Sequence, residues 1–405
     1  MRKLFLAVAL LAAGVSAAAG ELLTEAQSVR QGLARPEVAE LANSTVGEAE
    51  ANAIEAGLWA NPTLEYLHDR TRGVPGTSEQ IWQVNQPLDV AGRRGLKGEA
   101  GARRTDAVRA GNAGQRAELA AAIKRRYYEV LLKQEVARST ESWLQQLGRA
   151  EHIFTLLQQA GEVSGYDRRR LARERQLAQA RLAIERGELV LARERLAALT
   201  GVPDDPSPGV AGALLPPAPP QLDAVLARLA EQPVLRELAF KADAAVLEGK
   251  AAARGWLPEV TAGIGTKQIS DGVARGSGPL VSLSVPLPLF DHQQGARHRA
   301  AAQEQGARAD YQLTLARFTG EARGLHRQLE HLIAAATAYR RDAVVSSGDL
   351  VRIAEAAYQA GESTLLELLD AYKGALETET TALDLEWKAR QACIEFDLLT
   401  GSIPE

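Results

Sequence analysis

Two short stretches decide the fold of this chain: QPLDVAGRR at 86–94 and VPLPLFDHQQG at 285–295. Each stretch closes a strand-like segment and opens a window of 115 residues without proline, from Leu88 to Val202 and from Leu289 to Ile403. The 17 prolines of the 405-residue chain would place about five in a window of that length. Because proline breaks helix interiors, the two equal windows predict two long helical arms.

A pair of strands is predicted before each arm. Apolar and polar residues alternate along these segments, and turn-forming residues separate the two strands of each pair. The expected loop of the second pair runs from Gly272 to Gly278. The predicted strands cover about 62–69 and 80–89 in the first half and about 258–267 and 279–288 in the second half.

The two arms match each other at an offset of 200 residues. Gly161 corresponds to Gly361, and the Leu-Thr-Gly end at 199–201 corresponds to the one at 399–401. These identities predict an internal duplication, with a helix end at each glycine. The predicted organisation is a signal peptide at 1–19, a first repeat at 20–202 with its arm at 93–201, a proline-rich linker at 203–220, and a second repeat at 221–405 with its arm at 292–401.

Each arm is predicted to fold back on itself as a helical hairpin. After the two glycines, Ser164 with Asp167 and Thr364 with Glu367 have the spacing of residues that cap a new helix. The helices before and after each turn are expected to hold roughly 60 to 65 and about 38 residues. In the second arm, a seam with coiled-coil spacing is interrupted at Glu379 and consists of Leu365, Leu369, Tyr372, Leu376 and Leu383.

The N-terminus predicts export. Arg2 and Lys3 precede an apolar run at 4–15 and small residues at 16–19, which is the arrangement of a cleavable secretory signal peptide. The single cysteine, Cys393, lies far from this segment, so we expect no N-terminal lipid and no internal disulfide. The net charge of −4 gives no electrostatic reason to expect nucleic-acid binding.

Four strands per chain leave two interpretations open. Four are too few to close a membrane barrel, which needs about eight or more. Either they form a small soluble sheet that caps a coiled coil, or several chains pool their strands, and three chains would supply twelve. The alternation of apolar and polar residues at 281–287 suits a lipid-facing barrel strand and an ordinary half-buried sheet equally.

The two strand-to-helix stretches resemble the corresponding junctions of outer-membrane efflux proteins of the TolC family. They are most similar to those of its CzcC-like heavy-metal branch, which serves resistance-nodulation-division (RND) pumps. Asn61-Pro62-Thr63-Leu64 before the first strand, the Gly-Glu-x-Ser/Thr runs at 161–164 and 361–364, and the Leu-Thr-Gly arm ends resemble the same pattern. The resemblance covers essentially the whole mature chain.

The resemblance implies a mainly α fold with a small β part, built as two repeats of a β-hairpin plus a long α-helical coiled-coil hairpin. A homotrimer would form a 12-stranded β-barrel in the outer membrane lipid of a Gram-negative cell, continued by an α-helical barrel in the periplasm. The protein would be the passive channel of a tripartite RND-type efflux system for heavy-metal cations. Its partners would be a periplasmic adaptor (membrane fusion protein) and an inner-membrane RND pump.

The resemblance also implies roles for the ends of the helical hairpins. The tips that dock the adaptor would be Gly161, Glu162, Val163, Ser164, Gly361, Glu362, Ser363 and Thr364. The gate at the periplasmic entrance would contain Asp167, Tyr358, Glu367 and Asp370. The alternative for each group is structural, because glycine ends helices, Ser and Thr cap them, and acidic residues suit a helix N-terminus. The basic run 168–170 makes the first tip unlike the acidic second tip and favours salt bridges across the hairpins.

No enzyme motif, cofactor site or metal site is predicted. The pairs His292 with His298 and His326 with His331 are six and five residues apart, not four, the spacing that aligns two metal ligands on a helix. The sequence contains no nucleophile elbow or phosphate loop, so we expect a protein that is not an enzyme. Two other functions stay open: the same kind of duct for organic drugs or type I secretion, and a soluble periplasmic coiled-coil scaffold.

Overall fold

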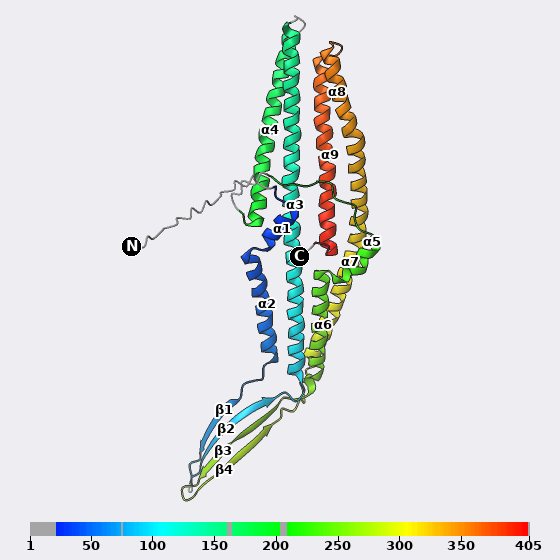
Figure 1. Cartoon of the computed structure of the whole chain (residues 1–405). Helices are drawn as coiled ribbons and strands as arrows, with labels where there is room; N and C mark the ends of the chain where they lie inside the picture. Colours follow the sequence, from blue (N-terminus) through cyan, green and yellow to red (C-terminus); the bar gives the residue numbers. More distant parts are fainter. Residues whose placement is uncertain (1–21, 74–75, 160–163, 203–208, 404–405) are drawn as a thin grey trace, which may run out of the picture. The chain divides into compact units, whose positions relative to one another are not determined.

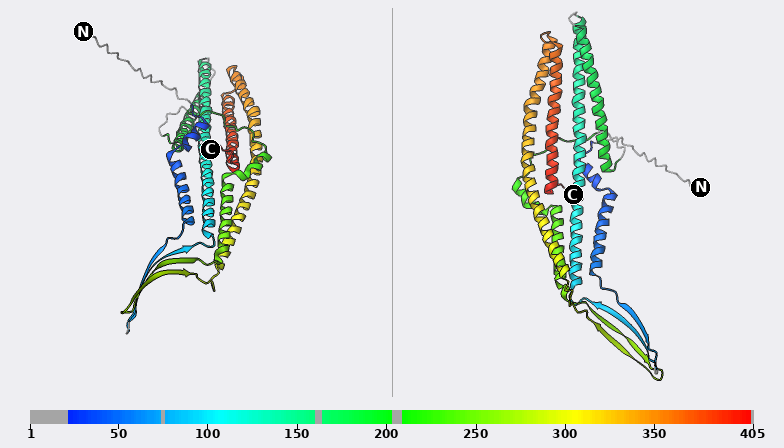
Figure 2. Two further views of the ribbon diagram at one scale, coloured as in Figure 1. Left: turned by 60° about the horizontal axis from the view of Figure 1, so that its bottom comes forward. Right: turned by 180° about the vertical axis from the view of Figure 1, so that it is seen from behind.

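A computed structural model describes residues 22–73, 76–159, 164–202 and 209–403 of the chain. It is mainly α-helical with one small antiparallel sheet, which confirms the predicted fold class (Figures 1 and 2). The chain divides into two compact units. Unit 1 comprises Met1–Gly32, Ala122–Pro217 and Leu332–Gln391, and unit 2 comprises Leu33–Ala121, Ala218–His331 and Ala392–Glu405. The predicted signal peptide lies outside the described residues.

The elements follow one another in the order of two similar halves. The first half contains α1 (Glu25–Leu33), α2 (Pro36–Gly57), β1 (Thr63–Arg70), β2 (Ser78–Leu88), α3 (Arg93–Gln159) and α4 (Gly165–Thr200). The second half contains α5 (Leu222–Arg228), α6 (Pro233–Ala253), β3 (Val260–Ser270), β4 (Arg275–Ser284), α7 (Gln294–Tyr339), a π turn (Arg340–Val344), α8 (Val345–Gln359) and α9 (Leu365–Thr400). Short 3₁₀ turns at Leu229–Glu231 and Arg254–Trp256 flank α6.

The junction stretches begin the long helices by supplying acceptors for free backbone N–H groups. The Asp89 carboxylate accepts from the N–H groups of Arg93 (3.0 Å) and Arg94 (2.7 Å), while Gly92 takes a positive φ of 62°. At the second junction, the Asp291 carboxylate accepts from the N–H of Gln293 at 2.7 Å. A helix N-terminus leaves its first N–H groups without intrahelical partners, so Asp89 caps the start of α3, whereas Asp291 stabilises the turn just before α7.

The helices that return from the two hairpins repeat each other in length and position. Helices α4 and α9 have 36 residues each, and their ends lie 200 residues apart in the sequence. Each is followed by a glycine in the left-handed region, Gly201 with φ 77° and Gly401 with φ 71°. This geometry matches the helix ends predicted from the Leu-Thr-Gly motifs.

All four strands form one antiparallel sheet in the order β1-β2-β3-β4. Strands β2 and β3 pair along their whole lengths, from Ser78 opposite Ser270 to Leu88 opposite Val260, so the two hairpins are joined into one sheet. The second loop is shorter than the predicted span from Gly272 to Gly278. The Asp271 carboxylate accepts from the N–H groups of the turn, and β4 already begins at Arg275. Strand β4 also ends at Ser284 instead of 288, since prolines at 286 and 288 cannot donate to the ladder.

We predict that Gly265→Ala destabilises the sheet. A Cβ atom at Gly265 would collide with the backbone carbonyl oxygen of Trp82, which cannot move without disturbing the pairing of β2 with β3. We expect a loss of about 1–3 kcal/mol in unfolding free energy, the usual cost of overpacking, measurable as a lower melting temperature of the purified protein. Gly278→Ala is the matched control, because a Cβ there meets nothing within 4 Å. Equal melting temperatures for the two variants would contradict the prediction.

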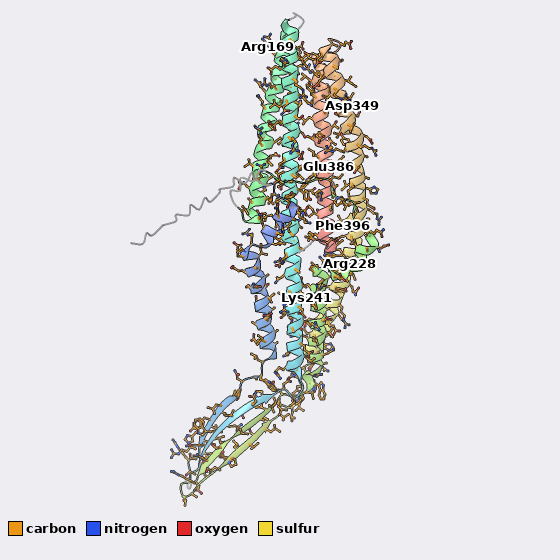
Figure 3. All side chains as sticks on the ribbon, in the orientation of Figure 1. Arg169, Arg228, Lys241, Asp349, Glu386 and Phe396 are labelled. Carbon is orange, nitrogen blue, oxygen red and sulfur yellow. The ribbon has the colours of Figure 1, made fainter. Side chains whose placement is uncertain are left out.

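The core of unit 1 is the apolar seam between the two helical hairpins. The predicted seam residues Leu365, Leu369, Tyr372, Leu376 and Leu383 are all buried. All of them except Leu383 belong to one cluster with Trp143, Leu147 and Phe154 of α3 and Leu171 of α4. The interruption at Glu379 is filled by an ion pair, because Arg340 in the π turn contacts Glu379 at 2.6 Å and Glu386 at 2.8 Å. Glu386 is labelled on α9 in Figure 3.

The proline-rich tract is held against unit 1 by hydrogen bonds. Residues 203–208 of the predicted linker lie outside the described residues, and 209–217 have no helix. Val210 forms a parallel bridge with Leu23 and accepts a hydrogen bond from the Gln134 side chain at 3.1 Å. The guanidinium of Arg390 donates to the carbonyl oxygens of residues 213, 214 and 215, each at 2.9 Å. The described part of the tract is therefore anchored.

Candidate functional site

The sheet presents a large apolar surface to the surroundings. By strand alternation and pairing register, Leu64, Val84, Ile264 and Val281 form one row across all four strands, on the same side as Tyr66, Trp82 and Leu283. We call this side the apolar face. Val281 is 81% exposed and Ile264 is 70% exposed. Figures 1 and 2 show the helices of unit 2 beyond one end of the sheet, and none of them lies over its faces. A water-soluble sheet would bury such a face.

The opposite side of the sheet, which we call the polar face, carries a chain of hydrogen-bonded side chains. The Gln83 amide donates to Ser282 Oγ at 2.6 Å and also to Asn85 Oδ1, and Asn85 Nδ2 donates to the Glu65 carboxylate at 2.8 Å. Gly263 lies beneath these side chains, because a Cβ there would meet Asn85, Ser282 and Gln83. The chain of hydrogen bonds therefore joins β1, β2 and β4 over a gap that glycine leaves on β3.

Carboxylates are concentrated on the polar face. Glu65, Asp69 and Glu79 belong to it by strand alternation, and its one strand cation, Lys267, is paired with Glu79. The apolar face of the described strands carries no carboxylate. A sheet with one apolar face and one face of acidic and hydrogen-bonded side chains has the sidedness of a wall between lipid and water.

The turn between α8 and α9 has well-formed helix-end chemistry. Gly361 has a φ of 73°, and the N–H of Glu362 reaches the carbonyl of Ala357 at 2.9 Å, which is a Schellman motif. The Glu367 carboxylate accepts from the N–H of Thr364 at 2.8 Å, and Thr364 Oγ1 accepts from the N–H of Glu367 at 3.4 Å. This is the predicted capping box. The turn is thus a rigid and defined surface, with the Glu362 side chain exposed.

The corresponding turn of the first hairpin differs in its cap. Gly161, Glu162 and Val163 lie outside the described residues. Ser164 caps α4 by accepting from the N–H of Tyr166 at 3.1 Å, and among the described residues Asp167 forms no reciprocal hydrogen bond with Ser164. Arg169, which belongs to the basic run after Asp167, is exposed near the start of α4 (Figure 3).

Unit 1 brings two of the predicted gate residues into electrostatic contact. Tyr358 is buried in the seam between the hairpins, and burial together with the negative charge of Asp167 raises the pKa of its phenol. Asp167 is on α4 and Tyr358 is on α8, so the charge of one hairpin acts on a side chain of the other, and Tyr358 shares its apolar cluster with Leu171 of α4. The other two predicted residues, Glu367 and Asp370, are both exposed near the start of α9.

A second link between the hairpins was missed by the sequence analysis. Arg149 of α3 lies 3.5 Å from the Glu355 carboxylate of α8, which also accepts a hydrogen bond from the Tyr372 hydroxyl at 2.8 Å. Burial and this carboxylate raise the pKa of Tyr372. Glu355 lies three residues before Tyr358, one turn away on the same helix face. This spacing could have indicated that Glu355, like Tyr358, faces the other hairpin.

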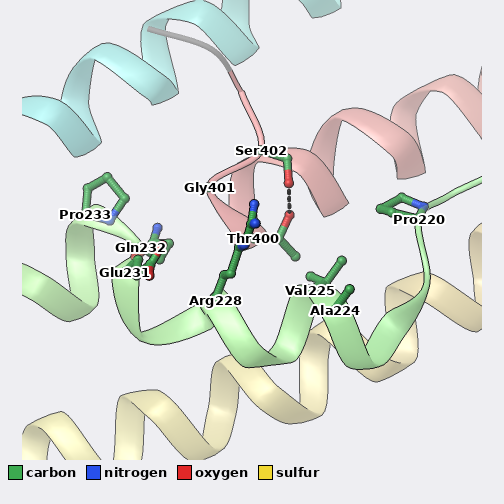
Figure 4. A pocket seen from close by; sticks show the side chains of 10 residues that line it. All are labelled: Pro220, Ala224, Val225, Arg228, Glu231, Gln232, Pro233, Thr400, Gly401 and Ser402. Carbon is green, nitrogen blue, oxygen red and sulfur yellow. Dashed lines mark hydrogen bonds between the residues drawn. The ribbon is translucent and has the colours of Figure 1, made fainter.

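The described residues offer little for catalysis or metal binding. They contain no cluster of three or more His, Cys, Asp or Glu side chains that could hold a metal ion. A pocket of about 600 Å³ in unit 2 is lined by Arg228, Glu231 and Gln232 among others, and by no histidine or cysteine (Figure 4). Its Gln232 side chain is engaged in capping α6. None of the described helices is long and apolar enough to cross a bilayer.

Comparisons with known proteins point to one family. The sequence profile described as outer membrane efflux protein matches residues 227–402. The cobalt-zinc-cadmium resistance protein CzcC of Cupriavidus metallidurans is 26% identical over 361 residues, or 87% of this chain and 84% of that protein. The nickel-cobalt-cadmium resistance protein NccC of Alcaligenes xylosoxydans xylosoxydans is 25% identical over 290 residues, or 69% of this chain and 64% of that protein. The crystal structure of CusC shares the fold with a TM-score of 0.75 at 17% identity, covering 93% of this chain and 91% of that one.

Proposed function

Because this chain belongs to the outer membrane efflux protein family, of which it is a CzcC-like member, we propose that it forms the outer-membrane channel of a tripartite RND-type efflux system and conducts heavy-metal cations out of the periplasm. It is a passive duct and not an enzyme. The energy comes from an inner-membrane pump, and a periplasmic adaptor joins pump to channel. Metal cargo is supported by the resistance functions in the names of the two relatives.

The observation that carries this proposal is the two-sided sheet. Its apolar face is exposed, its polar face carries hydrogen-bonded and charged side chains, and its edge strands β1 and β4 each lack a partner on their outer side among the described strands. An open sheet edge cannot exist in lipid, because each unpaired backbone group costs several kcal/mol there. Three copies placed edge to edge supply twelve strands, pair every edge and turn all apolar faces outward. This arrangement makes the protein a homotrimer in the outer membrane.

The polar face then lines the channel and suits a cationic cargo. Glu65 and Asp69 have no cationic partner among the described residues, whereas Glu79 is paired with Lys267. A wall with a surplus of carboxylates raises the local concentration of cations and lowers that of anions. The sidedness of charge agrees with a cationic cargo such as heavy-metal ions.

The family resemblance supports a gate at the ends of the hairpins. Glu367 and Asp370 supply two exposed carboxylates per protomer, which makes six in a trimer. The Arg149–Glu355 pair joins the two hairpins of one protomer. The described tip residues, Ser164 and 361–364, form the surface proposed to dock the adaptor. Their defined caps support this role, because a rigid turn binds a partner with little loss of conformational entropy.

We predict that Glu367→Gln with Asp370→Asn changes conduction. Glutamine preserves the capping box with Thr364, so the variant removes charge without removing the cap. Single-channel recordings in planar bilayers are expected to show weaker block by divalent cations and higher conductance, because the ring of carboxylates that attracts and holds cations is gone. Glu377→Gln, an exposed carboxylate further along α9, is the control. Unchanged block in the double variant would rule out the gate role.

The function as a whole is tested by removing the protein from its host. We expect increased sensitivity to cobalt, zinc, cadmium or nickel salts, measured as a lower inhibitory concentration, with restoration by the intact chain. We expect cell fractionation to recover the protein in the outer membrane. In a detergent gel of unheated sample, it should run as a trimer that the detergent does not dissociate. Sensitivity to organic drugs with normal tolerance of metals would support the alternative cargo, and recovery only as a soluble monomer would support the scaffold.

A further inference from the structure

The apolar face changes character toward the two hairpin turns. A pocket of about 620 Å³ lies on this end of the sheet, and Arg70, Arg275, Gln80 and Gln268 are among the residues that line it. The pocket lining includes no carboxylate. We propose that this pocket binds the phosphorylated headgroup of a glycolipid in the outer leaflet. The orientation of the pocket toward lipid rests on the proposed function.

Strand register arranges the side chains of this face in ordered layers. Arg70, Ser78, Ser270 and Arg275 lie opposite one another in a single row across the four strands, and His68, Gln80, Gln268 and Ser277 form the next row. The row after that contains Tyr66 and Trp82, whose ring centroids are 4.4 Å apart. Leu64 and Val281 follow in the apolar row. This succession of apolar, aromatic, amide and cationic side chains matches a lipid leaflet from its acyl chains to its charged headgroups.

The two arginines are available for an anionic ligand. Neither forms an ion pair with the described residues, whereas Lys267 on the polar face is held by Glu79. The carboxylates at this end of the strands, Asp69 and Glu79, belong to the polar face by alternation. The carboxylate of the adjoining turn, Asp271, is hydrogen-bonded to backbone N–H groups of that turn. Positive charge is therefore uncompensated on the side that faces lipid.

The spacing of the arginines favours a large headgroup with more than one phosphate. Three strand-to-strand steps of about 4.8 Å separate the Cα atoms of Arg70 and Arg275 by roughly 14 Å. Each guanidinium can bind a phosphate through two parallel hydrogen bonds. The serine hydroxyls and glutamine amides between them are suited to sugar hydroxyls. Acyl chains of the same molecule would continue over the aromatic row onto the apolar rows.

The experiment uses the purified full-length trimer in a neutral detergent and measures lipid binding by native mass spectrometry. The probe is lipid A, a glucosamine disaccharide lipid with two phosphates, compared with its dephosphorylated form and with inorganic phosphate alone. Arg70→Gln with Arg275→Gln removes both cations, and Arg70→Lys with Arg275→Lys keeps the charge without the two-pronged geometry. Lys267→Gln is the matched control, because it removes a strand cation from the opposite face.

We expect the glutamine double variant to bind lipid A at least tenfold more weakly, the lysine double variant to be intermediate, and Lys267→Gln to bind like the wild type. Dephosphorylated lipid A is expected to bind weakly to every form. The proposal would be overturned if the glutamine double variant bound lipid A as tightly as the wild type does. It would also be overturned if the wild type bound inorganic phosphate as tightly as lipid A. Conductance of the same preparations separates the two hypotheses. A wild-type protein that does not conduct refutes the channel, whereas normal conductance with unchanged lipid binding refutes only the lipid site.

Discussion

Replacing Val281 with arginine is expected to prevent assembly of the protein in the outer membrane. Val281 lies in the apolar row of β4 and is 81% exposed in the single chain. If that face meets lipid, an arginine near the middle of the bilayer costs about 2–4 kcal/mol per copy, and a trimer carries three copies. The detergent-resistant trimer should disappear from outer-membrane fractions, and resistance to metals should be lost with it.

The matched control for this variant is the next residue of the same strand. Ser282 faces the polar side and accepts a hydrogen bond from Gln83, so Ser282→Arg places the same charge in water. We expect this variant to assemble, with altered conductance. A soluble scaffold makes the opposite prediction for Val281, since a charge at an exposed position of a soluble protein changes stability by about 0.5 kcal/mol or less. Normal assembly of Val281→Arg would therefore exclude the lipid-facing sheet.

Replacing Arg390 with alanine is expected to cause the largest loss of stability in unit 1. This arginine is buried, donates to three successive carbonyl oxygens of the tract at 213–215, and stacks over the Tyr128 ring at 4.1 Å. Hydrogen bonds to a charged group contribute about 1.5–3 kcal/mol each, and three buried acceptors would lose their donor together. We expect a loss of about 3 kcal/mol or more in unfolding free energy, measured by thermal or urea unfolding.

Two further variants make the Arg390 experiment specific. Arg390→Lys keeps the charge but offers a single ammonium group in place of the planar fork, so we expect intermediate stability. Arg352→Ala removes an exposed arginine of α8 that forms a solvent-exposed ion pair with Asp349. Such pairs contribute little, so the unfolding free energy should change by less than about 1 kcal/mol. A melting temperature of Arg390→Ala equal to that of Arg352→Ala would show that the tract is not held by this side chain.

The features that sequence analysis predicted correctly are those that depend on near neighbours along the chain. Proline breaks a helix locally, and the Thr364–Glu367 box and the glycine at 361 act within one turn, so the helices and the helix ends at this turn were correctly predicted. Strand alternation identified the face that contains Val281 and Leu283. It could not decide between lipid and a buried core, because the alternation is the same in both.

The features that were missed depend on pairs of residues far apart in the sequence. The Arg149–Glu355 pair joins residues 206 positions apart, and the Arg340–Glu379 pair joins residues 39 apart. Glu379 looked like a defect in the seam because its partner lies on another helix. The loop before Arg275 was predicted too long because the strength of the Asp271 turn depends on hydrogen bonds that composition does not reveal.

The π turn at Arg340–Val344 makes the two arms differ in the direction of their side chains, although their lengths are equal. A wider turn inserts one extra residue into the helical repeat, and each residue advances a helix by about 100°. Every side chain from Val345 to Gln359 therefore points in a direction that counting from α7 would misplace. Helix α3 runs from Arg93 to Gln159 without such a break. Suppose that α8 were replaced by the corresponding part of α3. The arm would keep its length, but a different set of residues would face α9. The two halves of the chain are therefore no longer interchangeable.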